Sequence, residues 1–225
     1  LSIIMRQPIT LPRGDMRRFM LYGLVAALHF LLYIASLSFT TIAHSLALVY
    51  TAPIFIAVFS SLLLKEHIAP RRYVGIVIAV LGIAVLAGFE PTMTPRMLLG
   101  DLLALGSAVC FGFYSVFGRS QRTRYPLFTY AFTVYALAAL WLLPAAVVAF
   151  KPVYTLPAIV AIAFLGIFPL GIGHTLYNAA VRRVHAAYAN LIATQEVTGG
   201  IILGILLLGE IPSPSSIVGA IIAMI

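Results

Sequence analysis

Charged residues are scarce in this chain of 225 residues, because Asp, Glu, Lys and Arg together make up only 9% of it. Hydrophobic residues make up 62%, and the mean hydropathy is +1.08. A soluble domain of this length cannot bury so much apolar surface in one core. The few charges are clustered and leave apolar stretches of about 20 residues, the length at which a helix spans a bilayer. The sequence therefore predicts an all-α integral membrane protein.

Cysteine and the common catalytic motifs are also nearly or wholly lacking. The single Cys110 excludes an internal disulfide framework and offers no metal-binding spacing. The patterns G-x-x-x-x-G-K-[ST], G-x-S-x-G and H-E-x-x-H do not occur, which argues against ATP hydrolysis and against the familiar hydrolases. The net charge of +8 arises in short loops between apolar stretches, a pattern of membrane topology rather than of nucleic-acid binding. We expect no cofactor, no metal, no catalytic residue and no nucleic-acid partner.

Apolar runs between helix-breaking residues predict about eight helical segments. They cover residues 17–40, 42–64, 72–89, 97–118, 127–149, 156–181 and 186–208, with a last segment that opens near Ser213. That last segment leaves about 13 residues, too few to cross a bilayer, and residues 1–5 are also too short. We therefore expect the sequence to be truncated at both ends.

Basic residues alternate between the loops. The stretches Arg6–Arg18, Lys65–Arg72, Arg119–Arg124 and Arg182–Arg183 are basic, and the loops between them carry at most one Lys or Arg each. Lys and Arg in short loops favour the cytoplasmic side. The alternation predicts that these four loops lie inside, and it predicts a multi-pass protein of the cell inner (cytoplasmic) membrane.

One segment occurs twice. Leu62–Gly75, "LLLKEHIAPRRYVG", and Leu206–Gly219, "LLLGEIPSPSSIVG", share three leucines, a glutamate, a proline and a Val-Gly pair at an offset of 144 positions. The copy predicted to lie inside keeps its positive charges, and the copy predicted to lie outside lacks them. This exchange indicates an inverted repeat. We predict a first repeat at 1–94, made of the end of one helix and three further helices, and a second repeat of five helices at 95–225.

The motif glutamates, Glu66 and Glu210, stand between the end of one helix and the start of the next. Free backbone N–H groups and the positive end of a helix dipole favour an anion at such a position. We interpret both glutamates as part of the hairpin architecture rather than of the transport chemistry.

The repeated L-L-L-x-E…P…V-G element, the inverted repeat and the many Ala and Gly residues in the spans resemble the drug/metabolite transporter superfamily, most closely its EamA-type members. The resemblance implies a carrier of five plus five helices with a substrate cavity near the membrane midplane. It places the cavity among helices 17–40, 42–64, 97–118, 156–181 and 186–208. It also implies the export of amino acids or related metabolites.

Glu196 is an acid inside a predicted span, about ten residues into the 186–208 helix. A carboxylate exposed to lipid there costs about 2.5 kcal/mol or more, so this side chain should face a cavity or a partner. We predict that Glu196 binds a substrate ammonium group or a proton, and proton coupling of transport stays open. The alternative is a buried acid that holds two helices together by hydrogen bonds.

Polar residues on two helices complete the predicted substrate site. His174, Tyr177 and Asn178 share one side of the 156–181 helix, and His29 and Tyr33 form an i, i+4 pair on the 17–40 helix. Two inverted helices that each present His and Tyr can meet across the pseudo-twofold axis, where they suit a polar or zwitterionic solute. Interhelical hydrogen bonding is the alternative, at about 0.6 kcal/mol per bond. Further candidates are Tyr50, Tyr114, Asn190, Thr194 and Gln195.

These features together predict a secondary transporter that moves a small-molecule substrate across the bilayer by alternating access. An intramembrane enzyme that uses His174, Tyr177 and Glu196 as acid–base groups is one alternative, although it gives no reason for an inverted repeat. A passive channel is another, as is a carrier for drugs, nucleotide sugars or sugar phosphates. The sequence leaves the oligomeric state open.

Overall fold

The computed structural model describes residues 12–40, 42–66, 69–86, 94–150, 155–195 and 214–224, together with residues 199, 202 and 206. Within these ranges the chain is helical and contains no strand, which confirms the predicted all-α class. Five helical stretches in the described ranges are long and apolar enough to cross a membrane. They are Met16–Ser36, Ser45–Leu64, Pro95–Ser120, Leu127–Ala149 and Leu156–Arg183.

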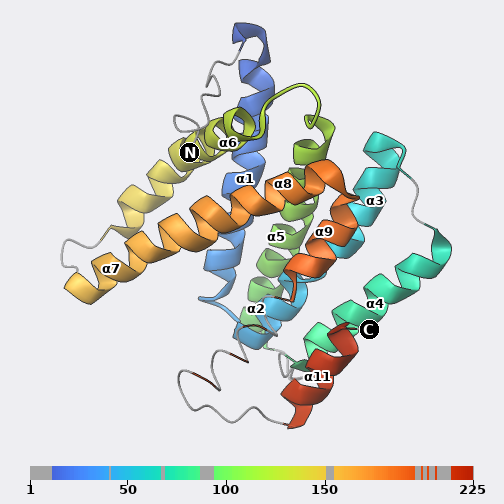
Figure 1. The fold of residues 1–225 in the computed structure, drawn as a ribbon. Helices are drawn as coiled ribbons and strands as arrows, with labels where there is room; N and C mark the ends of the chain where they lie inside the picture. The colour runs from blue at the N-terminus through green and yellow to red at the C-terminus, as the bar shows by residue number, and fades with distance from the viewer. Residues whose placement is uncertain are drawn as a thin grey trace.

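The centre of the molecule is a bundle of α1 (Met16–Ser36), α5 (Pro95–Ser120) and α6 (Leu127–Ala149). Helix α5 begins where Pro95 follows Thr94, whose hydroxyl accepts a hydrogen bond from the Met97 N–H at 3.2 Å. α1 packs along both α5 and α6 (Figure 1). Large aromatic side chains and alanines from these three helices form one core, in which the small residues allow the helices to approach closely.

The predicted 42–64 helix is interrupted in the structure. α2 (Ile42–Val49) ends at Tyr50 and Thr51, and α3 (Ala52–Leu64) starts afresh with Pro53 in its first turn. The N–H groups of Tyr50 and Thr51 bond to the carbonyls of residues 46 and 48. The predicted span is thus present as the helical stretch Ser45–Leu64, with a local irregularity at Tyr50–Thr51 that the prediction did not include, because Pro53 cannot donate to the preceding turn.

An equivalent helix end lies 144 positions later, at the offset of the sequence repeat. α9 (Ala186–Ala193) ends at Thr194 and Gln195, whose N–H groups bond to the carbonyls of residues 190 and 192. Both copies of this helix thus stop at equivalent positions with equivalent backbone hydrogen bonds. Equivalent helix ends at the repeat offset fit an inverted-repeat transporter.

The predicted 156–181 helix is also irregular. α7 (Leu156–Leu165) continues through a π-helical stretch, η2 (Gly166–Gly173), into α8 (His174–Arg183). Pro169 lies inside η2, and the His174 N–H bonds to its carbonyl, five residues back. Pro and π-helical turns rotate the following residues relative to a regular helix. α8 begins directly at His174, so this irregularity sets the direction of the His174 side chain.

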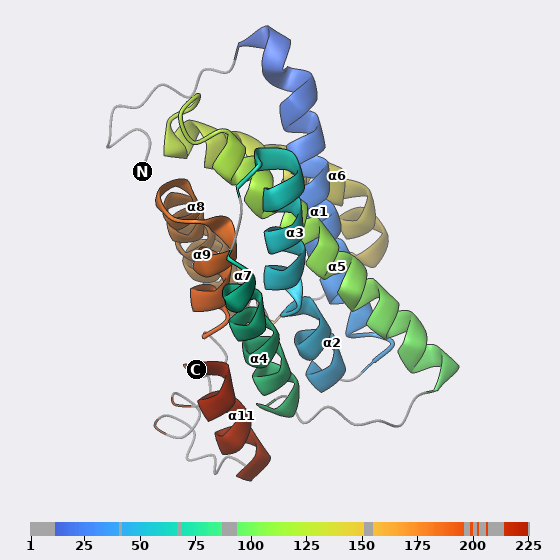
Figure 2. The ribbon, with the colours of Figure 1, turned by 90° about the vertical axis from the view of Figure 1, so that its right-hand side faces the viewer.

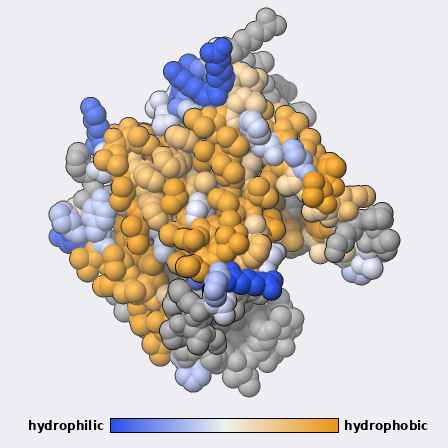
Figure 3. Space-filling view, turned by 180° about the vertical axis from the view of Figure 1, so that it is seen from behind, coloured by the Kyte–Doolittle hydropathy of each residue, from blue (hydrophilic) through white to orange (hydrophobic). Residues whose placement is uncertain are grey.

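α4 (Pro70–Leu86) and α11 (Pro214–Met224) pack on each other beside the bundle (Figure 2). The rear face of the molecule is broadly hydrophobic, with hydrophilic groups at its top, at one side and in its lower middle (Figure 3). Such a surface fits a protein whose sides are covered by lipid rather than water. The chain is therefore a multi-pass membrane protein.

Candidate functional site

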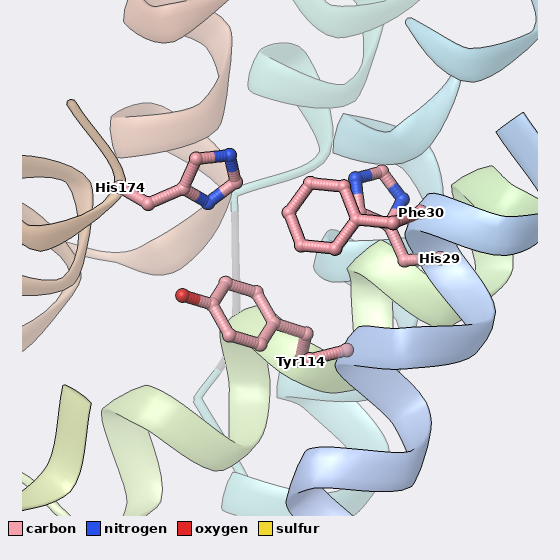
Figure 4. A pocket seen from close by; sticks show the side chains of 5 residues that line it. His29, Phe30, Tyr114 and His174 are labelled. Atoms are coloured by element: carbon pink, nitrogen blue, oxygen red, sulfur yellow. The ribbon is translucent and has the colours of Figure 1, made fainter. Parts of the chain in front are cut away.

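A small hollow lies where α1, α5 and α8 meet. It is lined by Ala26, His29 and Phe30 of α1, Tyr114 of α5 and His174 of α8. Figure 4 shows His174 facing Phe30 and His29 across it, with Tyr114 beside them. The side chains close around it so tightly that it has no room for a water molecule. The structure thus brings three predicted site residues, His29, Tyr114 and His174, to one place in the bundle core, in a closed arrangement.

His29 is fixed to α5 through Ser107. The Ser107 hydroxyl donates to the His29 carbonyl at 2.8 Å and lies 2.9 Å from His29 Nδ1, which is also 3.2 Å from the Ser107 carbonyl. Since the single hydroxyl hydrogen goes to the carbonyl, Nδ1 carries the imidazole hydrogen and donates it. This tautomer leaves His29 Nε2 as a hydrogen-bond acceptor.

His174 is less constrained than His29. Its Nδ1 atom is buried and has no hydrogen-bond partner among the described residues. Aromatic rings surround it instead, with ring centroids at 5.3 Å for Phe30 and 6.3 Å for Phe111. A buried imidazole nitrogen without a protein partner is a group that a bound solute can satisfy.

Asn178, one turn beyond His174, organises a polar network beneath the hollow. Its side chain is 1% exposed, and its Nδ2 group lies 2.5 Å from the Tyr114 hydroxyl, 2.6 Å from the Tyr135 hydroxyl and 2.9 Å from the His174 carbonyl. The two tyrosine hydroxyls also bond to each other at 2.7 Å. Sequence reasoning missed Tyr135, although a tyrosine so far from the ends of the 127–149 span was a usable signal.

Tyr177 extends the network toward α9. Its hydroxyl lies 2.6 Å from the Ser115 hydroxyl and hydrogen-bonds to the Asn190 side chain. Thr194 is buried at the end of α9 and donates to the Leu191 carbonyl at 2.7 Å. The predicted residues Tyr177, Asn178, Asn190 and Thr194 therefore lie on the two adjacent helices α8 and α9.

The other predicted site residues are placed differently. Tyr33 is half-buried one turn along α1 from His29 and does not line the hollow. Tyr50 and Gln195 are half-buried at the two helix interruptions. Glu196 and Glu210 lie outside the described residues. The predicted residues therefore do not form one cluster. Some surround the hollow, Tyr33 lies one turn away from it, and Tyr50 and Gln195 lie at helix ends.

Glu66 holds a second cluster together, at the end of the bundle where α3 ends. Its carboxylate is 2.5 Å from Arg119 Nε, 3.4 Å from Arg122 Nη2 and 3.8 Å from His185 Nε2. We call these four residues the Glu66 cluster. The structure gives Glu66 a structural role, but with other partners than the free N–H groups of the following helix, because its carboxylate lies against basic groups at the end of α5, in the loop after it and in the α8–α9 connection. Charge pairing across distant segments leaves no local sequence signal.

The same end of the bundle holds a further ion pair. Arg124 Nη2 lies 2.8 Å from the buried Asp15 carboxylate, to which the Tyr125 hydroxyl also donates. Burial and, next, this hydrogen bond raise the pKa of the Tyr125 hydroxyl. Residues of all four basic loops predicted to lie inside contact one another here, since Arg182 donates to the Arg122 and Tyr125 carbonyls.

The opposite end is held by different contacts. The Thr40 hydroxyl donates to the Asp101 carboxylate at 2.7 Å, and Arg96 donates to the Ser38 carbonyl at 2.8 Å. These residues belong to the loops predicted to lie outside and to the first turns of α5. In the described ranges no cluster of His, Cys, Asp and Glu has the arrangement of a metal site.

Comparison with known proteins gives a consistent result. Curated relatives include an uncharacterized transporter of Clostridium kluyveri, 24% identical over 84% of this chain and 63% of the relative. Another, from Archaeoglobus fulgidus, is 29% identical over 71% of this chain and 56% of the relative. The uncharacterized transporter YdfC of Bacillus subtilis is 28% identical over 79% of this chain and 58% of the relative. The chain spans about three fifths of the length of these relatives.

A solved crystal structure has the same fold, with a TM-score of 0.81 over 96% of this chain and 75% of that chain, at 22% sequence identity. The family model of the EamA-like transporter family matches residues 1–88 and 98–225. The two matched ranges together cover nearly the whole sequence. The chain therefore belongs to the EamA-like transporter family.

Proposed function

We propose that the protein is a secondary transporter that exports amino acids or related small metabolites across the cytoplasmic membrane by alternating access. The hollow between His29 and His174 is the substrate site of this proposal. The observation that carries it is the unpartnered, buried His174 Nδ1 at the edge of the hollow. A polar atom left without a partner in the core of a membrane protein is expensive, and such atoms mark binding sites.

The chemistry of the lining favours an uncharged or zwitterionic solute. Its five residues offer two imidazoles, two aromatic rings and a methyl group, and none of them is Lys, Arg, Asp or Glu. A phosphate group would need a basic partner at the point of binding. The lining therefore supports amino acids over the alternative of sugar phosphates or nucleotide sugars.

Alternating access requires that the closed hollow opens by movement of one part of the bundle against another. The equivalent helix ends at Tyr50–Thr51 and Thr194–Gln195, with matching backbone hydrogen bonds, support a division into repeats at 1–94 and 95–225. The π-helical stretch η2 lies directly before His174 and supplies a further irregular point. Since the basic loops gather at one end, we assign that end to the cytoplasm.

Transport should depend strongly on His174. We expect His174→Ala to lower kcat/KM for the transported amino acid at least tenfold, which corresponds to the loss of about 1.4 kcal/mol of transition-state stabilisation. Uptake and counterflow in proteoliposomes measure this. Thr175→Ala is the matched control, because the Thr175 hydroxyl bonds to the Gly171 carbonyl of its own helix. Wild-type transport by His174→Ala, or failure of every amino acid to compete, would contradict the proposal.

The same proteoliposomes distinguish the remaining classes of protein. A carrier shows saturable counterflow, whereas a passive channel does not. A solute that emerges chemically unchanged excludes an intramembrane enzyme acting on it. We expect saturable counterflow of an unmodified solute, and a proton gradient imposed across the vesicle tests proton coupling.

A further inference from the structure

We propose a second recognition site between the hollow and the basic end of the bundle, specific for an α-amino acid zwitterion. Arg182 and the Tyr130 hydroxyl bind the carboxylate, and the Asn178 side-chain carbonyl binds the ammonium group. This inference rests on the proposed function, because it names the substrate chemistry that the transporter selects on the way to the hollow. We call these three residues the zwitterion site.

The zwitterion site continues the polar face of α8. His174, Asn178 and Arg182 are spaced at i, i+4 and i+8, so they follow one another along one side of the helix. His174 borders the hollow, and Arg182 reaches the loop carbonyls at the end of the bundle. A solute that leaves or enters at that end passes along this face.

Arg182 differs from the other paired arginines at this end of the bundle. Arg119 and Arg122 face the Glu66 carboxylate, and Arg124 faces Asp15. The partners that Arg182 has in the described part of the chain are neutral, the backbone carbonyls of residues 122 and 125. Its Nη1 atom is buried and donates to nothing there. A guanidinium in such a setting is a site for an anion.

Tyr130 supplies the second donor. Its side chain is 1% exposed, and its hydroxyl has no hydrogen-bond partner among the described residues. The Arg182 guanidinium is near enough to act electrostatically on that hydroxyl. A guanidinium N–H and a phenol O–H are donors of the kind that bind the two oxygens of one carboxylate.

Asn178 supplies the acceptor. Its Nδ2 group is used by the network beneath the hollow, but its Oδ1 atom is buried and unpartnered within the described ranges. A Cβ placed on Gly118 would lie 3.0 Å from Asn178 Oδ1 and 3.6 Å from the Tyr130 hydroxyl. Both atoms therefore border the same narrow strip of α5. Two donors next to one acceptor reproduce the charge pattern of an α-amino acid.

Ligand-induced thermal stabilisation of the purified protein tests the zwitterion site without a transport assay. The probes are the common amino acids, each compared with its amide, which lacks the carboxylate, and with its deaminated acid, which lacks the ammonium group. We expect at least one amino acid to raise the unfolding temperature, with an apparent affinity at least tenfold higher than that of either analogue.

Three variants locate the effect. Arg182→Gln should weaken the amino-acid response at least tenfold, and Arg183→Gln, an exposed neighbour, should leave it unchanged. Tyr130→Phe should weaken the response severalfold while the ligand-free protein is at least as stable as wild type, because it removes an unsatisfied buried hydroxyl. Tyr130→Phe keeps the test valid if Arg182→Gln does not fold.

The outcomes separate the two proposals. The zwitterion site is overturned if no amino acid stabilises the protein, if amide and acid act equally, or if Arg182→Gln and Tyr130→Phe respond like wild type. Transport of amino acids together with equal binding of their amides overturns the site and leaves the proposed function intact. Selective binding without transport in proteoliposomes supports the site and contradicts the proposed function.

Discussion

Arg119→Met is expected to lower the free energy of unfolding by about 3 kcal/mol, the low end of the range for a broken buried ion pair. Arg119 is 12% exposed and Glu66 is 20% exposed, so both charges are largely shielded from water. The variant also removes the hydrogen bonds from Arg119 Nη1 to the Val181 and Val184 carbonyls, at 2.9 Å and 2.5 Å. Glu66 keeps Arg122 and His185, which limits the loss. Unfolding by denaturant titration in mixed micelles measures the change.

Arg96→Met is the control for the Glu66 cluster. Arg96 is exposed and donates one hydrogen bond to the Ser38 carbonyl, so its loss should cost less than about 0.5 kcal/mol. The double variant Glu66→Gln with Arg119→Met should be less harmful than the sum of the single changes, because neither charge is then left alone. Equal losses for Arg96→Met and Arg119→Met, or strict additivity, would show that the Glu66 cluster does not hold these helices together.

Gly23→Ala is expected to destabilise the protein by about 2–3 kcal/mol, the upper part of the usual range for overpacking of a core. A Cβ at Gly23 would lie 2.6 Å from the Leu137 Cβ and 3.1 Å from the Ala138 backbone nitrogen. These atoms belong to the α6 backbone or are fixed to it, so they cannot move aside by a change of rotamer. The two helices would have to separate, and the same micelle titration would record the loss.

Gly75→Ala provides the matched control for this prediction. It introduces the same methyl group inside helix α4, where nothing lies within 4 Å. Because alanine has a higher helix propensity than glycine by about 1 kcal/mol, this variant should be neutral or stabilising. A loss at Gly75 as large as that at Gly23 would mean that close approach of α1 and α6 is not the cause.

Most of the fold could be predicted from the sequence, because a helix that crosses a bilayer must be apolar over about 20 residues. The predicted 127–149 helix coincides with α6, and the predicted basic end is the end where Asp15, Arg124 and Arg182 meet. The interruption at Tyr50–Thr51 was missed although Pro53 was visible. A proline in the first turn of a new helix and a proline within a kinked helix look alike in sequence.

The candidate site was predictable in part. His29, Tyr114 and His174 stood out as polar residues in apolar spans, and the structure brings them to one hollow. Tyr135 was missed although it lies well inside the 127–149 span, away from the membrane interfaces where tyrosine commonly serves as an anchor. The Glu66 cluster could not be predicted, since its partners lie on segments whose approach only the folded bundle shows.

The pairing of α4 with α11 has a consequence for biosynthesis. The whole of residues 87–213 separates these two helices in the chain. At about 5–20 residues per second, α4 leaves the ribosome on the order of ten seconds before its partner exists. During that interval its inner face rests against acyl chains, which is tolerable because lipid solvates apolar side chains about as well as a neighbouring helix does. Closure of this pair therefore waits for the translation of α11.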